Sequence, residues 1–338
     1  MQYPPPFHGY EFPLYYGGLA AAQEKRSLRK EANALCLLLV GIEAFLLFLT
    51  GISSLFLGSM DLQGGSNSLF NGYPPVLSYL AHNAIYIAGL SLPVFFYWAI
   101  RGIRAEAVLP FEHVRPLTAV AYVLFGTSIC TLSNLPADFV IALEQRMGFS
   151  GSIPDLPLNG DPAVSVLFFF AMSVIPPLTE ELIFRGAVLQ GLRAFGDGFA
   201  IVGSAFLFAV YHGNFSQAVF AFPCGLVMAF AVVKTGNLWV SVAIHFLNNG
   251  ISVALELIQY SLGHNIPALF HYYFVVSVVL GLAALIYLSV RDHSLFNLNR
   301  PASLLRPSQK FGTLVWNVGG VILLSLSLIS AFYMLTSY

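Results

Sequence analysis

Charged side chains are scarce in this sequence, since Asp, Glu, Lys and Arg together make up only 9% of its 338 residues. A soluble globular domain carries about 25% of such residues, so the composition excludes a chain that is soluble as a whole. Hydrophobic residues account for 57% of the sequence, and the mean hydropathy is +0.76. The composition therefore predicts an integral membrane protein.

An excess of positive charge is missing as well. The formal net charge is −1, which gives no basis for expecting a nucleic-acid partner. Cysteine occurs only three times, within apolar runs and without CxxC spacing, at Cys36, Cys130 and Cys224. We therefore expect neither a disulfide framework nor a zinc–thiolate site, and we interpret these cysteines as small buried hydrophobic residues.

Apolar runs of about 20 residues, long enough to cross a ~30 Å hydrocarbon core, recur along the chain. They predict an all-α, polytopic membrane protein with about eight or nine transmembrane helices around an intramembrane polar chamber. The fifth and sixth runs are short, and we expect the turn between them to lie below the outer membrane surface. The expected spans are 34–57, 76–100, 116–133, 163–193, 198–212, 216–233, 237–260, 268–290 and 312–335.

The spans divide the chain into five regions. The first region is too long and too polar to begin a secretory signal, so we expect no cleavage there. The loop after the third span is expected to hold a short amphipathic helix at 136–147. The regions are a cytoplasmic segment 1–33, N-terminal transmembrane helices 34–133, an extracytoplasmic loop 134–162, a core with the candidate site 163–260, and C-terminal transmembrane helices 261–338.

Lys and Arg residues indicate the orientation, because they accumulate on the cytoplasmic side of membrane proteins. If the N-terminus is cytoplasmic and nine spans alternate, thirteen of the fifteen basic residues fall on that side. Arg146 then lies outside, and Arg185 lies within the membrane. We therefore expect a cytoplasmic N-terminus and an extracytoplasmic C-terminus, in the cytoplasmic membrane of a bacterium.

Two adjacent carboxylates and an arginine interrupt one of the longest apolar runs, in the sequence IPPLTEELIFRG at 175–186. A charge at bilayer depth costs about 2.5 to more than 10 kcal/mol, so it indicates a function and requires a partner. Glu181 and Arg185 share a helix face, whereas Glu180 is rotated by about 100°. We therefore expect Arg185 to neutralise Glu181 and to leave Glu180 available for chemistry. The two prolines are expected to break the helix just upstream and to place both carboxylates near a helix N-terminus.

Two later spans carry polar groups at a similar depth. Phe208 and His212 end the fifth span, and His245 and Asn249 share one face of the seventh. From the rise of about 1.5 Å per residue, Glu181, His212 and Asn249 lie roughly 18 to 21 Å from the cytoplasmic ends of their spans. His245 lies about 12 Å from the same end of its span. This convergence near mid-membrane predicts a polar reaction site formed by three spans.

These residue types suit the activation of a water molecule. A carboxylate with an imidazole can take a proton from water, and a second imidazole with an amide can donate hydrogen bonds to a developing oxyanion. The same His and Glu residues could instead bind zinc, although no HExxH motif is present and Asn is a poor zinc ligand. Each group taken alone could also be an interhelical hydrogen bond or a structural ion pair.

Three motifs follow one another on successive spans: EExxxR at 180–185, FxxxH at 208–212 and HxxxN at 245–249. They resemble the motifs of the CAAX protease and bacteriocin-processing family (CPBP, or Abi), the intramembrane glutamate endopeptidases that include the CAAX prenyl endopeptidase. The resemblance covers about residues 160–255. It implies proteolysis of a membrane protein or peptide within the bilayer, by a metal-free mechanism without a cofactor.

The resemblance also assigns roles, position by position. It implies that Glu180 and His212 activate the attacking water, and that Glu181 and Arg185 orient and support this carboxylate. The resemblance also implies that His245 and Asn249 stabilise the oxyanion and that Phe208 lines the site. The flanking regions carry no motif, so the resemblance does not identify the substrate.

The remaining intramembrane polar residues are given structural roles. We interpret Glu43, His82 and Asn83 as packing or interface residues and Glu256 as an interfacial residue. Asn248 could assist the adjacent amide of the third motif.

Two rival functions remain open. The first is a non-catalytic bacteriocin-immunity factor or scaffold that binds peptides with the same residues. The second is a proton-coupled transporter, because Glu and His also form proton relays, although we find no internal inverted repeat in the sequence.

Overall fold

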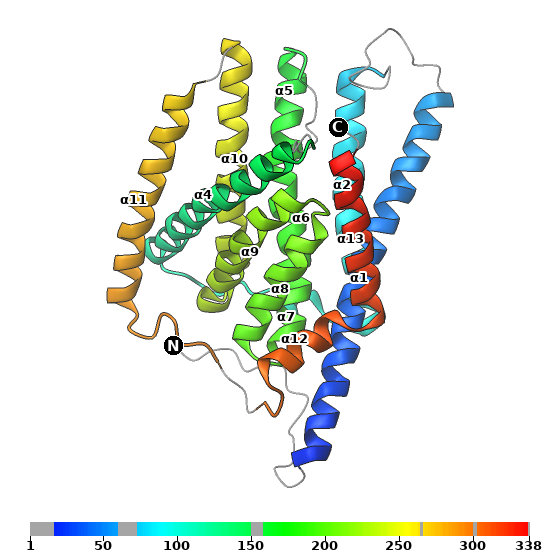
Figure 1. Cartoon of the computed structure of the whole chain (residues 1–338), viewed down its shortest axis with the longest axis vertical. Coiled ribbons are helices and arrows are strands. Elements are labelled where there is room, and N and C mark those ends of the chain that lie inside the picture. The colour runs from blue at the N-terminus through cyan, green and yellow to red at the C-terminus, as the bar shows by residue number, and fades with distance from the viewer. Residues whose placement is uncertain (1–16, 60–72, 150–157, 264–265, 300–302, 337–338) are drawn as a thin grey trace.

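The protein is a bundle of long helices, described here from a computed structural model that covers residues 17–59, 73–149, 158–263, 266–299 and 303–336 (Figure 1). Eight helices within these ranges are long and apolar enough to cross a membrane. They confirm the expected all-α, polytopic membrane protein. The eight are α1 (Gly17–Ser59), α2 (Pro75–Arg101), α4 (Pro116–Arg146), a composite helix over Pro162–Arg193, α9 (Phe215–Thr235), α10 (Leu238–Leu262), α11 (Pro267–Arg291) and α13 (Val318–Thr336).

Shorter helices connect or complete this bundle. They are α3 (Ala105–Val108), α8 (Asp197–Tyr211) and α12 (Pro307–Val315). In Figure 1, α6, α8 and α9 occupy the middle, with α1, α2 and α13 on one side and α11 on the other. α4 packs along both α9 and α11, and α1 packs along both α2 and α13. The centre of the bundle is thus enclosed by helices from both ends of the chain.

The composite helix corrects one expectation, because the two prolines do not break it. Its parts are α5 (Pro162–Phe169), the π-helical segment η2 (Phe170–Val174), α6 (Ile175–Glu181), the π-helical segment η3 (Leu182–Val188) and α7 (Leu189–Arg193). Pro176 and Pro177 occupy the first turn of α6, where missing N–H groups are best tolerated. The wider turn of η2 absorbs the interrupted hydrogen-bond ladder just upstream. The carboxylates therefore lie inside a continuous helical rod, not at a free helix N-terminus.

Three expected helix ends also differ from the structure. α1 begins at Gly17 and not at 34, since its polar start is rich in Ala, Glu, Lys and Arg, which are good helix formers. α4 does not end at 133 but continues through Pro136 to Arg146, so the amphipathic helix expected at 136–147 is its last part. The last span begins at 318 and not at 312, because Trp316 leaves the helical conformation (φ −91°, ψ 58°) between α12 and α13.

α8 and α9 form a hairpin whose turn lies beside α13. α8 has 15 residues, which corresponds to about 22 Å of rise. Gly213 in the turn has φ +57°, and a Cβ atom there would come within 2.8 Å of Ser330 Oγ in α13. Asn214 caps α9 by accepting a hydrogen bond from Gln217 N. α13 continues past Ser330 to Thr336, so it extends beyond the point where it contacts the turn.

Candidate active site

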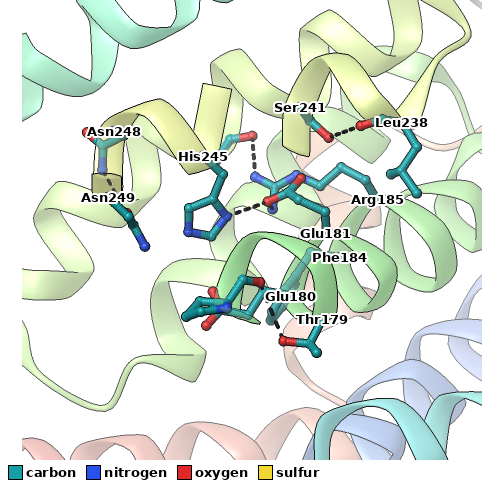
Figure 2. A network of polar contacts seen from close by, with 12 residues as sticks. Thr179, Glu180, Glu181, Phe184, Arg185, Leu238, Ser241, His245, Asn248 and Asn249 are labelled. Carbon is teal, nitrogen blue, oxygen red and sulfur yellow. Dashed lines mark hydrogen bonds and ion pairs between the residues drawn. The ribbon is translucent and has the colours of Figure 1, made fainter. Parts of the chain in front are cut away.

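A buried ion pair occupies one side of the turn between α6 and η3. Arg185 Nη1 donates a hydrogen bond of 2.9 Å to Glu181 Oε1, and both side chains are fully buried. His245 Nδ1, from α10, contacts the same oxygen at 2.9 Å (Figure 2). Arg185 Nη2 also donates to the carbonyl of Gly225 at 3.3 Å, and the guanidinium lies 4.7 Å from the ring centroid of Phe208. The expected pairing of Glu181 with Arg185 is therefore present, with a histidine as a third member.

The second carboxylate lies on a different side of this turn (Figure 2). Glu180 is 7% exposed, and its Oε1 accepts a hydrogen bond of 2.9 Å from the hydroxyl of Tyr86 in α2. The ring of Tyr86 in turn stacks on His82, with 5.9 Å between ring centroids. Glu180 is therefore held by a neutral donor, whereas its neighbour is held by a cation.

Tyr86 is a candidate functional residue that the sequence analysis missed. It stands in an apolar span without a charged neighbour, and its partner is 94 positions away along the chain. A tyrosine hydroxyl inside a membrane helix needs a hydrogen-bond partner. This need for a partner was the only signal in the sequence that could have pointed to Tyr86, and it did not show that the partner would be Glu180.

His212 directly follows the last residue of α8. Its Nδ1 lies 2.7 Å from the carbonyl oxygen of Phe208. A carbonyl only accepts, so Nδ1 carries the hydrogen and Nε2 of the neutral ring is left as an acceptor. His212 is close enough to Glu180 for their charges to interact. The geometry therefore brings together a carboxylate and an imidazole that can both accept a proton.

Glu43 lies close to this side of the site, although we interpreted it as a packing or interface residue. It comes from α1, and its charge reaches Tyr211, the residue before His212. Its charge also reaches Tyr86. A third carboxylate thus stands beyond the tyrosine that binds Glu180.

Asn249 lies one helical turn beyond His245 on α10. Its Nδ2 donates a hydrogen bond of 3.0 Å to the carbonyl of Met172, which belongs to η2. A side-chain amide nitrogen has two hydrogens, so one of them remains for another acceptor. Asn248 Nδ2 donates to Asn249 Oδ1 at 3.0 Å, so the two side chains are in direct contact. The π-helical segment η2 thereby positions the amide.

Phe208 connects the two sides of the site. Its ring lies 4.7 Å from the ring of His212 and 6.1 Å from that of His245, centroid to centroid. The side chains of Arg185 and Glu181 are fully buried, whereas those of His212 and Asn249 are only half-buried. The structure therefore gathers all the residues of the three motifs into one group: Glu180, Glu181, Arg185, Phe208, His212, His245 and Asn249.

The same group fits a metal ion poorly. Within the described ranges, no three His, Cys, Asp or Glu side chains come together as a possible metal site. His245 Nδ1 and Arg185 Nη1 both bind Glu181 Oε1, so these donors satisfy one another. The arrangement is that of an ion-paired cluster beside a carboxylate–imidazole pair.

The fold and this cluster define a polytopic membrane protein with a carboxylate–imidazole site between its helices. Comparison with known families supports the same conclusion, since residues 162–251 match the model described as type II CAAX prenyl endopeptidase Rce1-like. The match supports the resemblance of this part of the chain to the CAAX protease and bacteriocin-processing family. The matched segment begins with α5 and ends just beyond Asn249, so it contains all three motifs.

Two bacterial relatives resemble the same part of the chain. The membrane-embedded CAAX protease MroQ of Staphylococcus aureus is 32% identical over 100 residues, which are 28% of this chain and 40% of the relative. The putative membrane peptidase YdiL of Bacillus subtilis is 27% identical over 95 residues, which are 27% of this chain and 38% of the relative. The chain thus matches about two fifths of the length of each relative. No solved structure gives a significant match.

Proposed function

We propose that the protein is an intramembrane endopeptidase that hydrolyses a peptide bond of a membrane-embedded or lipid-anchored protein or peptide. One observation carries this proposal: of two adjacent buried carboxylates, Glu181 is neutralised by Arg185, whereas Glu180 faces His212 and the hydroxyl of Tyr86. Because Arg185 pairs with Glu181, the carboxylate of Glu180 is left available to act as a base. The two relatives, a CAAX protease and a putative membrane peptidase, support it.

Glu180 and His212 would activate the attacking water. The water oxygen forms a bond with the scissile carbonyl carbon, while its proton passes to the Glu180 carboxylate, assisted by His212 Nε2. The proton then moves to the leaving nitrogen as the C–N bond breaks, which restores the carboxylate. Tyr86 would hold Glu180 in position for both transfers.

His245 and Asn249 would stabilise the oxyanion that forms on the carbonyl oxygen. Asn249 has one amide hydrogen left after its bond to Met172. His245 uses Nδ1 on Glu181, so its Nε2 donates to an oxyanion only when the ring is protonated. The ion pair with Arg185 keeps Glu181 itself anionic and fixed.

The setting of this activity is also proposed. The substrate would be a peptide in the bilayer of a bacterial cytoplasmic membrane, with the N-terminus of the enzyme on the cytoplasmic side. The reaction would take place in the core 163–260. In the sequence, the N-terminal segment 1–33 and the helices 34–133 precede this core, and the C-terminal helices 261–338 follow it. The loop region 134–162 would be extracytoplasmic; of it, 150–157 lies outside the described residues.

Cleavage of labelled membrane peptides by the purified protein tests this proposal. The panel includes a farnesylated CAAX peptide, and each reaction runs with and without a chelator. Glu180→Ala and His212→Ala are expected to abolish cleavage. Glu256→Ala, which removes another intramembrane carboxylate outside the site, is expected to retain it.

The outcomes separate the rival functions. Cleavage lost in both site variants and unaffected by the chelator supports the metal-free mechanism. Cleavage abolished by the chelator contradicts it and assigns the same residues to a metal. If the folded wild-type protein cleaves no peptide, while an immunity phenotype survives both substitutions, a non-catalytic scaffold replaces the enzyme.

A further inference from the structure

A second polar region lies far from the candidate active site, where α1 and α13 begin. A groove of about 870 Å³ separates the first turns of α1 from the segment that links α12 to α13. One wall carries Arg26, Arg29 and Lys30, and the other carries Trp316, Val321 and Ile322. The groove is thus basic on one wall and aromatic and apolar on the other.

The basic wall has no carboxylate partner among the residues that the structure describes. Arg26, Arg29 and Lys30 are spaced so that they share one helix face, and all three are exposed. Among the described residues, none of them forms an ion pair. The carboxylates of the same helix are already engaged, since Glu24 accepts from Leu304 N and Glu31 binds Arg101 at 2.7 Å. Three positive charges therefore face the groove uncompensated.

Other cations near helix ends differ in whether they have a carboxylate partner, and Arg115, Arg146, Arg291 and Arg306 form no ion pair among the described residues. Arg104 lies 3.5 Å from Glu106, and Lys234 lies 3.4 Å from Asp292. Each of these basic groups has a carboxylate partner supplied by the protein. The three cations of the groove lack one and also line a single groove, so one external anion that enters it can lie near all of them.

The apolar wall indicates what carries that anion. Trp316 is 71% exposed, and the neighbouring Val321 and Ile322 are partly exposed as α13 enters its apolar span. Exposed tryptophan next to a transmembrane helix is typical of the membrane–water interface. α13 touches α1 directly at Gly319, where a Cβ atom would come within 2.8 Å of Asn33 O. α1 and α13 are therefore in close contact at Gly319, and α13 presents an apolar surface beside the groove.

We propose that this groove binds an anionic phospholipid of the adjacent leaflet. The phosphate would lie against the three cations, and an acyl chain would follow Trp316 and the first turns of α13. A free phosphate or a soluble acidic ligand would use the cations but leave the apolar wall uncovered, so a lipid fits the whole groove. Basic pockets between transmembrane helices are known binding sites for anionic headgroups. This inference does not depend on the proposed function.

Quenching of Trp316 fluorescence by brominated lipids tests the proposal directly. The full-length protein is reconstituted in phosphatidylcholine vesicles that contain brominated phosphatidylglycerol or, for comparison, brominated phosphatidylcholine. The signal of Trp316 is the difference between the wild type and Trp316→Phe. We expect the anionic quencher to act at an at least about tenfold lower mole fraction than the neutral one, because each nearby cation adds to the attraction.

Two triple variants that lose the same amount of positive charge distinguish lipid binding in the groove from a general attraction between basic residues and anionic lipids. Arg26→Gln/Arg29→Gln/Lys30→Gln should abolish the preference for the anionic lipid. Arg104→Gln/Arg115→Gln/Arg291→Gln, which removes three cations outside the groove, should retain it. Circular dichroism confirms that each variant is folded. The proposal is overturned if the wild type shows no preference, or if both triple variants reduce it equally.

Discussion

Glu180 and Glu181 are chemically identical neighbours on one helix, yet they lie in two different environments. Glu181 faces the closed side of the site, where Arg185 and His245 share one of its oxygens and nothing is exposed. Glu180 faces the other side, where it accepts a hydrogen bond from the hydroxyl of Tyr86 and the nearby His212 is half-buried. A rotation of about 100° thus separates a structural carboxylate from a candidate base. The comparison shows that the surroundings of a residue decide its role.

Replacing Glu180 should produce the largest effect on the reaction. Glu180→Gln keeps the shape of the side chain and an oxygen that accepts from Tyr86, but it removes the base. We expect peptide cleavage to fall about 10²- to 10⁴-fold, the range for loss of a general base, with unfolding changed by less than about 1 kcal/mol. Cleavage assays and thermal unfolding in detergent measure the two quantities. Cleavage at the wild-type rate would refute the assignment of Glu180.

The same substitution at the neighbouring residue, Glu181, should instead lower the stability of the protein. Glu181→Gln removes the negative charge from beside Arg185 and leaves the guanidinium buried and unpaired. Breaking a buried pair in this way costs about 3 to 5 kcal/mol, so we expect a large drop in the unfolding midpoint. Glu180→Gln is its matched control. Equal stability of the two variants would show that the two sides of the turn do not differ as described.

Loss of the Tyr86 hydroxyl should produce an intermediate effect. A hydrogen bond to a charged group contributes about 1.5 to 3 kcal/mol, and only part of it acts in the transition state. We therefore expect Tyr86→Phe to lower kcat about tenfold while KM changes less than about twofold. The control is Tyr97→Phe, which removes another hydroxyl–carboxylate hydrogen bond of α2, to Glu31 at 3.2 Å. A fall in kcat of similar size in the control would contradict a specific role of Tyr86.

The ion pair between Lys234 and the exposed carboxylate of Asp292 should give the smallest effect, and it sharpens the contrast with the fully buried pair. The hydrogen bond from the Ser294 hydroxyl, together with the Ser294 N–H and the charge of Lys234, lowers the pKa of Asp292 below its ordinary value of 3.8. A lowered folded-state pKa adds stability above the unfolded value, and this contribution is lost as the pH falls through the folded value. Because Asp292 is 40% exposed, solvent screening limits the contribution to less than about 1 kcal/mol.

Comparison of Asp292→Asn with the wild type checks this sign. The variant should be slightly less stable at about pH 7 and should approach the wild type below about pH 4, where the carboxylate takes up a proton. Urea unfolding in detergent at both pH values measures the difference. A difference that grows as the pH falls would contradict the stated sign.

The basic groove extends the comparison to the whole molecule. Within the bundle, Arg185 is neutralised by a carboxylate four positions away. At the beginning of α1, three cations have no such partner among the described residues. Solvent and headgroups tolerate unpaired charge there, whereas the interior does not. The proposed lipid site and the proposed active site thus differ in whether the counter-charge comes from the chain or from the membrane.

The sequence by itself determined the elements that depend on local physics. Apolar runs predicted the transmembrane helices because length and hydrophobicity suffice to cross a bilayer. The spacing of four positions predicted the pairing of Glu181 with Arg185, because neighbours on one helix face must meet. The three motifs likewise identified the group of residues that the bundle gathers.

Only the tertiary structure decided how distant helices share these groups. His245 reaches the oxygen of Glu181 across 64 positions, and Tyr86 reaches Glu180 across 94. The π-helical segment η2 kept the helix continuous through the two prolines and brought the carbonyl of Met172 to Asn249. No local pattern encodes these contacts, because they depend on which helices pack side by side and at what height. Burial then requires each polar group to find a partner, and the fold selects which one.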